Sequence, residues 1–138
     1  MTKQQSGAAR ERALREEIET IEKDSGAKAV AVALHDAETG FELHYNAERW
    51  FHAASTIKIP VLLGVFAAID RGELLPHSRV HVRNRFLSVV EQIPFRVEPG
   101  RDANSAVHDA TGKMMRVDEL AYHMITTSSN LATNLLLG

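Results

Sequence analysis

The sequence predicts an α+β fold in which an N-terminal helix, a two-strand hairpin and a helical region follow one another. Apolar residues recur every three or four positions over 9–23, fill two short runs over 27–45, and return to a helical period from residue 53. The length of 138 residues and the apolar fraction of 44% suit one folded domain. Residues 1–8 are polar, so we expect them to be disordered and residues 9–138 to form the domain.

The first helix is expected over 9–23 because its apolar side chains form a single stripe among many charges. The stripe consists of Leu14, Ile18 and Ile21. Residues 27–35 predict a strand that is apolar on both faces, which is typical of a strand covered on both sides. A turn at 36–40 and a second strand at 41–45 complete the hairpin.

The second half of the chain predicts three helices. The first starts near Ala53, runs for about 16 residues and is apolar over most of its circumference, so we expect it to be buried. Residues 77–101 contain prolines and mixed patterns, which indicate short elements joined by loops. Helical patterns return at 117–125 and at 131–137, separated by a polar break.

Composition excludes several classes of function. There is no cysteine, which rules out disulfides, thiolate metal sites and a cysteine nucleophile. Sixteen basic and 18 acidic side chains give a net charge of −2 without a basic stripe, so nucleic acid and anionic membranes are not expected partners. His77 and His81 have a spacing of four, but the sequence shows no third ligand near them, so no metal site is expected. No other cofactor is expected either.

No localisation follows from the sequence. No apolar run approaches the roughly 18 residues that span a bilayer. The polar stretch Met1–Arg15 contains no apolar segment of a secretory signal, so we expect none in this chain. A protein without cysteine is compatible with any redox compartment, and the location is left unknown.

Ser55 and Lys58 form the first candidate for chemistry. Ser55 lies where the apolar helix starts, near unpaired backbone N–H groups and the positive end of the helix dipole. An oxyanion formed there would be stabilised by the backbone N–H of the serine. Lys58 follows three positions later on the same helix face, and burial would lower its pKa enough to let it accept the serine proton. The structural alternative is that Ser55 is a helix N-cap and Lys58 a solvated charge.

Ser128 and Asn130 form the second candidate. They lie in the polar break that directly precedes the last apolar helix. Such a break places a hydroxyl and a carboxamide on the wall of a pocket. The alternative is again capping, with Ser128 or Ser129 as the N-cap of that helix.

Taken together, the two segments resemble motifs of class A β-lactamases and penicillin-binding proteins. Phe51-x-x-Ala54-Ser55-Thr56-x-Lys58 is similar to the nucleophile segment of that family. Ser128-Ser129-Asn130, with the helix that follows, is similar to its Ser-Asp-Asn element. The order of elements also agrees with the family, so the resemblance spans the chain from about Leu14 to Gly138.

The resemblance implies a β-lactamase-like (DD-peptidase-like) fold and an acyl-enzyme mechanism. Ser55 would be the acylated nucleophile, Lys58 its proton partner and Ser128 the hydroxyl that relays a proton to the leaving nitrogen. Asn130 would bind the amide side chain of the substrate. The implied substrate is a β-lactam or a peptide-like cell-wall amide, with other amides and esters as alternatives, and the family usually acts in the periplasm or outside the cell.

The sequence departs from the family in three respects. Position 129 is serine where the β-lactamase motif has aspartate, so a negative charge is lost there. The segment between Lys58 and Ser128 is longer than is typical of β-lactamases. The Lys-Thr-Gly motif and the Ω-loop glutamate, which follow the second motif in the family, do not occur, so no deacylation base is assigned; Glu91 and Glu98 have no pattern that places them in the site.

These departures predict a truncated domain. The family sheet has five strands, and we expect this chain to supply two of them. We therefore expect the chain to be inactive by itself, and either to self-associate or to be completed by a C-terminal chain. Two other functions are left open: a non-catalytic segment that binds a complementary chain, and a plain helical domain in which both motifs are caps.

Overall fold

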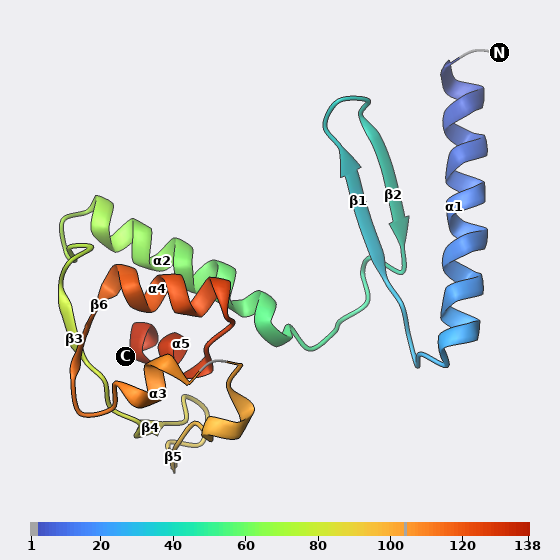
Figure 1. Ribbon diagram of the computed structural model, residues 1–138. Coiled ribbons are helices and arrows are strands. Elements are labelled where there is room, and N and C mark those ends of the chain that lie inside the picture. Colours follow the sequence, from blue (N-terminus) through green and yellow to red (C-terminus); the bar gives the residue numbers. More distant parts are fainter. Residues whose placement is uncertain (1–2, 104) are drawn as a thin grey trace. The chain divides into compact units, whose positions relative to one another are not determined.

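The computed structural model describes residues 3–103 and 105–138. The chain divides into two compact units, Met1–His52 and Ala53–Gly138, and each is described by itself. The first unit contains one helix and one hairpin, and the second contains the remaining helices and four short strands (Figure 1).

The first unit consists of helix α1 (Lys3–Ser25) and strands β1 (Val32–Asp36) and β2 (Phe41–Tyr45). The strands pair antiparallel, with Leu34 opposite Leu43. Hydrogen bonds join α1 to the hairpin: Arg15 donates to the carbonyl of His44 at 2.8 Å, and the Tyr45 hydroxyl donates to Glu22 at 2.6 Å.

Two expectations for this unit differ from the structure. Helix α1 begins at Lys3 rather than at residue 9, so residues 3–8 have helical backbone, while residues 1–2 of the segment expected to be disordered lie outside the described residues. The strand expected at 27–35 is confined to Val32–Asp36, and its three central residues are exposed. The exposure of these residues differs from the cover expected on both faces, and among the described residues β1 pairs only with β2.

The second unit is built around three helices: α2 (Lys58–Asp70), α4 (Val117–Thr126) and α5 (Asn130–Leu137), which pack on one another (Figure 1). Residues Ala54–Ile57 form a 3₁₀ turn, η1, that leads into α2. The buried core of the unit consists of Val82, Val97, Val107, Leu120, Met124, Leu131, Ala132 and Leu135. The core therefore lies between α4, α5 and the chain segments that cross beside them.

Shorter elements complete the second unit. Strand β3 (Arg79–His81) pairs with β6 (Met114–Arg116), and β4 (Phe86–Leu87) pairs with β5 (Pro94–Phe95). A 3₁₀ turn, η2 (Pro99–Arg101), and a short helix, α3 (Ala106–Asp109), lie between β5 and β6. The hairpin β1–β2 agrees with the two-strand hairpin expected from the sequence. The four further strands form separate pairs, and segments of two or three residues are too short to show a period in the sequence.

Helix α2 is also less buried than expected. Ile59, Leu63 and Phe66 on α2 are all more than half exposed, whereas Val65 is buried. The other helices of this unit cover one face of α2, and its opposite face is an exposed apolar surface within the described residues. We call Ile59, Leu63 and Phe66 the open face of α2.

Candidate active site

Ser55 and Lys58 meet at the junction of η1 and α2. Ser55 lies inside the 3₁₀ turn, and Lys58 is the first residue of the α-helix, where its backbone N–H donates to the carbonyls of Ser55 and Thr56. This tight turn brings Lys58 Nζ to 3.2 Å from Ser55 Oγ. Lys58 is only 4% exposed, so its amine is removed from bulk water.

The polar break before α5 approaches the same amine from a distant part of the chain. Lys58 Nζ lies 2.7 Å from the Ser128 carbonyl oxygen, 2.8 Å from Ser128 Oγ and 3.0 Å from Asn130 Oδ1. Ser128 Oγ also donates to Ser55 Oγ at 3.0 Å. The structure thus brings together all four residues singled out from the sequence, although more than 60 residues separate the two motifs.

Two residues of the site have a left-handed backbone conformation. Ala54, directly before the candidate nucleophile, has φ of 46°, and Ser128 has φ of 55°. Such conformations cost of order 1–3 kcal/mol for residues other than glycine and persist where the surroundings enforce them. They place Ser55 and Ser128 on the turns that bring the two hydroxyls together.

Burial lowers the pKa of Lys58 below its ordinary value, while the negative charge of Asp102 acts in the opposite direction and raises it. Two of the contacts of this amine, the Ser128 carbonyl and Asn130 Oδ1, are with oxygens that only accept hydrogen bonds. A neutral amine has two N–H donors for these oxygens, and its lone pair is then left for a serine hydroxyl. The arrangement is therefore compatible with an amine that accepts a proton.

Asp102 is a part of the site that the sequence reading misses. Its side chain is fully buried. Oδ1 accepts the backbone N–H of Asn130 at 2.8 Å, and Oδ2 accepts the N–H of Leu131 at 2.9 Å and the Ser129 hydroxyl at 3.1 Å. His108 Nε2 lies 3.2 Å from the same Oδ2. The carboxylate therefore binds the first turn of α5 and the motif that precedes it.

Burial by itself would raise the pKa of Asp102, but the hydrogen bonds from Leu131, Asn130, Ser129 and His108 outweigh it and lower that pKa below the ordinary value. Asp102 is therefore ionised at neutral pH. No spacing rule points to it, because it stands in a polar loop and its partners Ser129, Asn130 and Leu131 are distant in sequence. The only signal available in the sequence is an acidic residue between two apolar segments, which is too common to select one position.

Ser129 acts as the N-cap of α5. Its hydroxyl oxygen accepts the backbone N–H of Ala132 at 3.1 Å, while its proton is donated to Asp102. The carbonyl of Ser129 in turn accepts the Thr133 hydroxyl at 2.7 Å. The capping interpretation of the second motif is therefore correct for Ser129, and it coexists with the contacts of Ser128 and Asn130 to Lys58.

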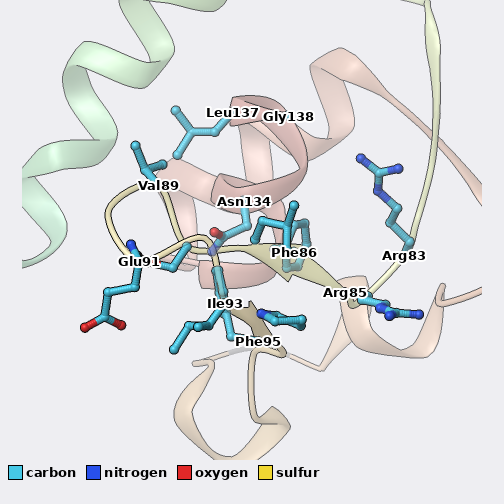
Figure 2. A pocket seen from close by; sticks show the side chains of 13 residues that line it. Arg83, Arg85, Phe86, Val89, Glu91, Ile93, Phe95, Asn134, Leu137 and Gly138 are labelled. Atoms are coloured by element: carbon cyan, nitrogen blue, oxygen red, sulfur yellow. Dashed lines mark hydrogen bonds between the residues drawn. The ribbon is translucent and has the colours of Figure 1, made fainter.

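An open hollow of about 910 Å³ lies away from these residues, at the β4–β5 hairpin and the end of α5. Figure 2 shows Phe86, Ile93 and Phe95 beside Asn134 in this hollow, with Arg83 and Arg85 at one side. Neither Ser55 nor Lys58 lines it. Glu91 does line it, whereas Ser128 does not.

Within residues 3–103 and 105–138 no group of three or more metal-ligating side chains is close enough to hold an ion. In the same part of the chain no helix combines the length and apolar character of a membrane span.

Comparison with known proteins places the chain in a family. The model of the β-lactamase enzyme family matches residues 13–138. A protein of Rhodobacter capsulatus named β-lactamase is 29% identical over 126 residues, which is 91% of this chain and 38% of that protein. An ancestral class A β-lactamase of known structure is 30% identical with a TM-score of 0.66, over 88% of this chain and 42% of its own.

Two further solved structures share the fold. A β-lactamase from Sphaerobacter thermophilus is 26% identical with a TM-score of 0.64, over 96% of this chain and 42% of its own. A β-lactamase from Xanthomonas campestris reaches a TM-score of 0.72 at 22% identity, over 91% of this chain and 42% of its own, and supports the fold alone.

The chain belongs to the β-lactamase enzyme family. Membership of this family supports the class of β-lactamase-like serine hydrolases. The predicted family and the α+β fold are confirmed. The chain spans about two fifths of the length of the relatives that it matches, and the match corresponds to their N-terminal part.

Proposed function

We propose that Ser55 is the nucleophile of a serine hydrolase that is acylated by a β-lactam or a related peptide-like amide. One observation carries the proposal: Lys58 Nζ lies within hydrogen-bonding distance of both Ser55 Oγ and Ser128 Oγ, and the two hydroxyls contact each other. Three groups capable of proton transfer are thus connected at one point. Family membership supports the reaction class.

The acylation step follows from these contacts. Neutral Lys58 donates its two N–H groups to the Ser128 carbonyl and to Asn130 Oδ1, and its lone pair accepts the proton of Ser55. Ser55 Oγ then attacks the carbonyl carbon of the substrate. As the tetrahedral intermediate collapses, the C–N bond breaks and an ester forms on Ser55. The proton passes from Lys58 through the Ser128 hydroxyl to the leaving nitrogen.

Asn130 has a second function in this proposal. Its Nδ2 donates to the carbonyl of Arg101 at 3.0 Å while its Oδ1 contacts Lys58, so both ends of the carboxamide are held. An amide side chain of the substrate would approach this edge of the site. The site requires no cofactor for the acylation step, because nucleophile, base and proton relay all come from side chains.

Activity and partners of the whole protein form the second part of the proposal. No residue of this chain is assigned to deacylation, so the chain alone is expected to be inactive in turnover. The open face of α2 offers an apolar surface to a complementary C-terminal chain or to a second copy. The same face favours the alternative function, a non-catalytic segment that binds a complementary chain.

Intact-mass spectrometry after incubation with a fluorescent penicillin tests the proposal. The expected result is an adduct of one penicillin per chain that disappears in Ser55→Ala and remains in Ser25→Ala, a matched change at an exposed serine at the end of α1. The experiment is repeated with the C-terminal half of a related class A β-lactamase added. An adduct formed only with that half identifies an incomplete enzyme. No adduct under either condition refutes the catalytic proposal and favours the binding alternative.

A further inference from the structure

The carboxylate of Asp102 holds the segment that carries Ser128 and Asn130. It accepts three hydrogen bonds from consecutive residues, namely the Ser129 hydroxyl and the backbone N–H groups of Asn130 and Leu131. These donors directly follow Ser128 in the chain. The positions of Ser128 Oγ and Asn130 Oδ1 relative to Lys58 Nζ therefore depend on Asp102.

Ser129 makes this dependence necessary. A serine at position 129 caps α5 through its oxygen, but it brings no negative charge. An aspartate there, as in the class A motif that the segment resembles, would combine the cap and the charge in one side chain. In this chain Asp102 Oδ2 accepts the Ser129 hydroxyl at 3.1 Å. The negative charge therefore lies on the hydrogen-bond partner of residue 129 and not on residue 129 itself.

The geometry points to Asp102 as the positioning residue that supplies, from the loop after η2, the negative charge and anchoring of an aspartate at position 129. The inference rests on the proposed function of Ser55 and Lys58. Asp102 keeps the oxygens of Ser128 and Asn130 against Lys58 Nζ, and its charge stabilises the ammonium that forms when Lys58 takes the Ser55 proton.

Two further observations support this role. The attraction of Asp102 raises the pKa of Lys58 against the effect of burial, so the two groups interact electrostatically. The residue next to Asp102 also contributes, since the carbonyl of Arg101 accepts Asn130 Nδ2. His108 Nε2, in contact with Oδ2, is the other titratable group that faces the carboxylate in the described structure. One loop thus fixes the motif through both its backbone and its side chain.

Exchanging the two side chains tests the inference. Asp102→Ser removes the charge, Ser129→Asp places two carboxylates in contact, and the double variant returns a single carboxylate to position 129. We expect each single variant to slow acylation of Ser55 by about 10- to 100-fold, since small displacements of reacting groups have effects of this size. The double variant is expected to recover most of the rate. Asp109→Ser, a matched change at an exposed aspartate of α3, is the control.

A second readout does not require substrate. The pKa of Lys58 is measured by NMR on lysine labelled with ¹³C at Cε, in the chain and in the same variants. It is expected to fall in Asp102→Ser and in the milder, isosteric Asp102→Asn, and to return in the double variant. These titrations are followed only in variants whose circular dichroism spectrum matches that of the unchanged chain.

The outcomes separate the two proposals. If no penicillin adduct forms on the unchanged chain, with or without the added C-terminal half, while the pKa of Lys58 shifts and recovers as described, the proposed function fails and the positioning role of Asp102 stands. If acylation occurs and neither its rate nor the pKa of Lys58 changes in the Asp102 variants, the inference is overturned and the proposed function stands. Failure of the double variant to recover both quantities also overturns the inference.

Discussion

Truncation of Leu120 to alanine tests the core of the second unit. Leu120 is completely buried on α4, within the cluster that includes Met124 and Leu131. Removing its buried side-chain atoms loses about 2–3 kcal/mol of transfer free energy. The cavity that remains raises the total cost to about 2–5 kcal/mol. This cost is a large fraction of the free energy of unfolding of an ordinary domain, which is about 5–15 kcal/mol.

Leu63→Ala is the matched control, because it makes the same chemical change on the open face of α2. Leu63 is 63% exposed, so its truncation should change the free energy of unfolding by less than about 0.5 kcal/mol. Urea unfolding followed by far-UV circular dichroism provides the measurement. Trp50, the only tryptophan, is almost fully exposed in the other unit, so its fluorescence is a poor probe of this core.

The result that would refute the reasoning is an equal cost for the two variants in a confirmed monomer. If the cost of Leu63→Ala instead rises with protein concentration, a second copy covers the open face of α2. If the cost rises only after a C-terminal half of a relative is added, that half covers the face. The comparison therefore tests the proposed partners as well as the core.

Two other predictions concern the polar side chains near α5. Ser129→Ala is expected to lower the free energy of unfolding by about 1–2 kcal/mol, because the cap on the Ala132 N–H is lost. Ser105→Ala is the control in the same urea assay. It should have little effect, because Ser105 makes no capping bond at the start of α3. Asp102 has a lowered pKa, so the unfolded chain binds more protons than the folded one below the ordinary value of 3.8. Its contribution to stability is therefore present above that pH and lost as the pH falls through its folded pKa. Urea midpoints on both sides of pH 3.8 should show this loss in the unchanged chain, and Asp102→Asn should lack it; an identical slope in both would contradict the assignment.

Local periodicity was sufficient for two helices of the second unit. Helices α4 and α5 agree with the expected ranges of 117–125 and 131–137 to within one residue at each end. The proximity of Lys58 to Ser55 also follows from helical spacing, because both belong to one continuous turn. Where a pattern is local, its physical cause lies in neighbouring residues, and the sequence is a sufficient guide.

Long-range features could not be predicted in this way. The contact of Ser128 and Asn130 with Lys58 was expected only from the resemblance to a family, since no spacing rule connects segments so far apart. Strands β3 and β6 pair through three residues each, which is too short for a period to appear. Asp102 was missed because its importance derives from the folded position of a loop. The apolar residues of the open face of α2 predict burial, but their exposure depends on what packs against them.

The pH dependence of Ser55 acylation, followed by mass spectrometry with and without the C-terminal half of a relative, tests the central claim that Lys58 accepts the proton of Ser55. With the lowered pKa of Lys58, the rate should rise with pH and level off below the ordinary lysine value of 10.5, because the neutral amine is the active form. Lys58→Arg, which stays charged, should form no adduct at any pH. Acylation of the Lys58→Arg variant at a rate close to that of the unchanged chain would contradict the account.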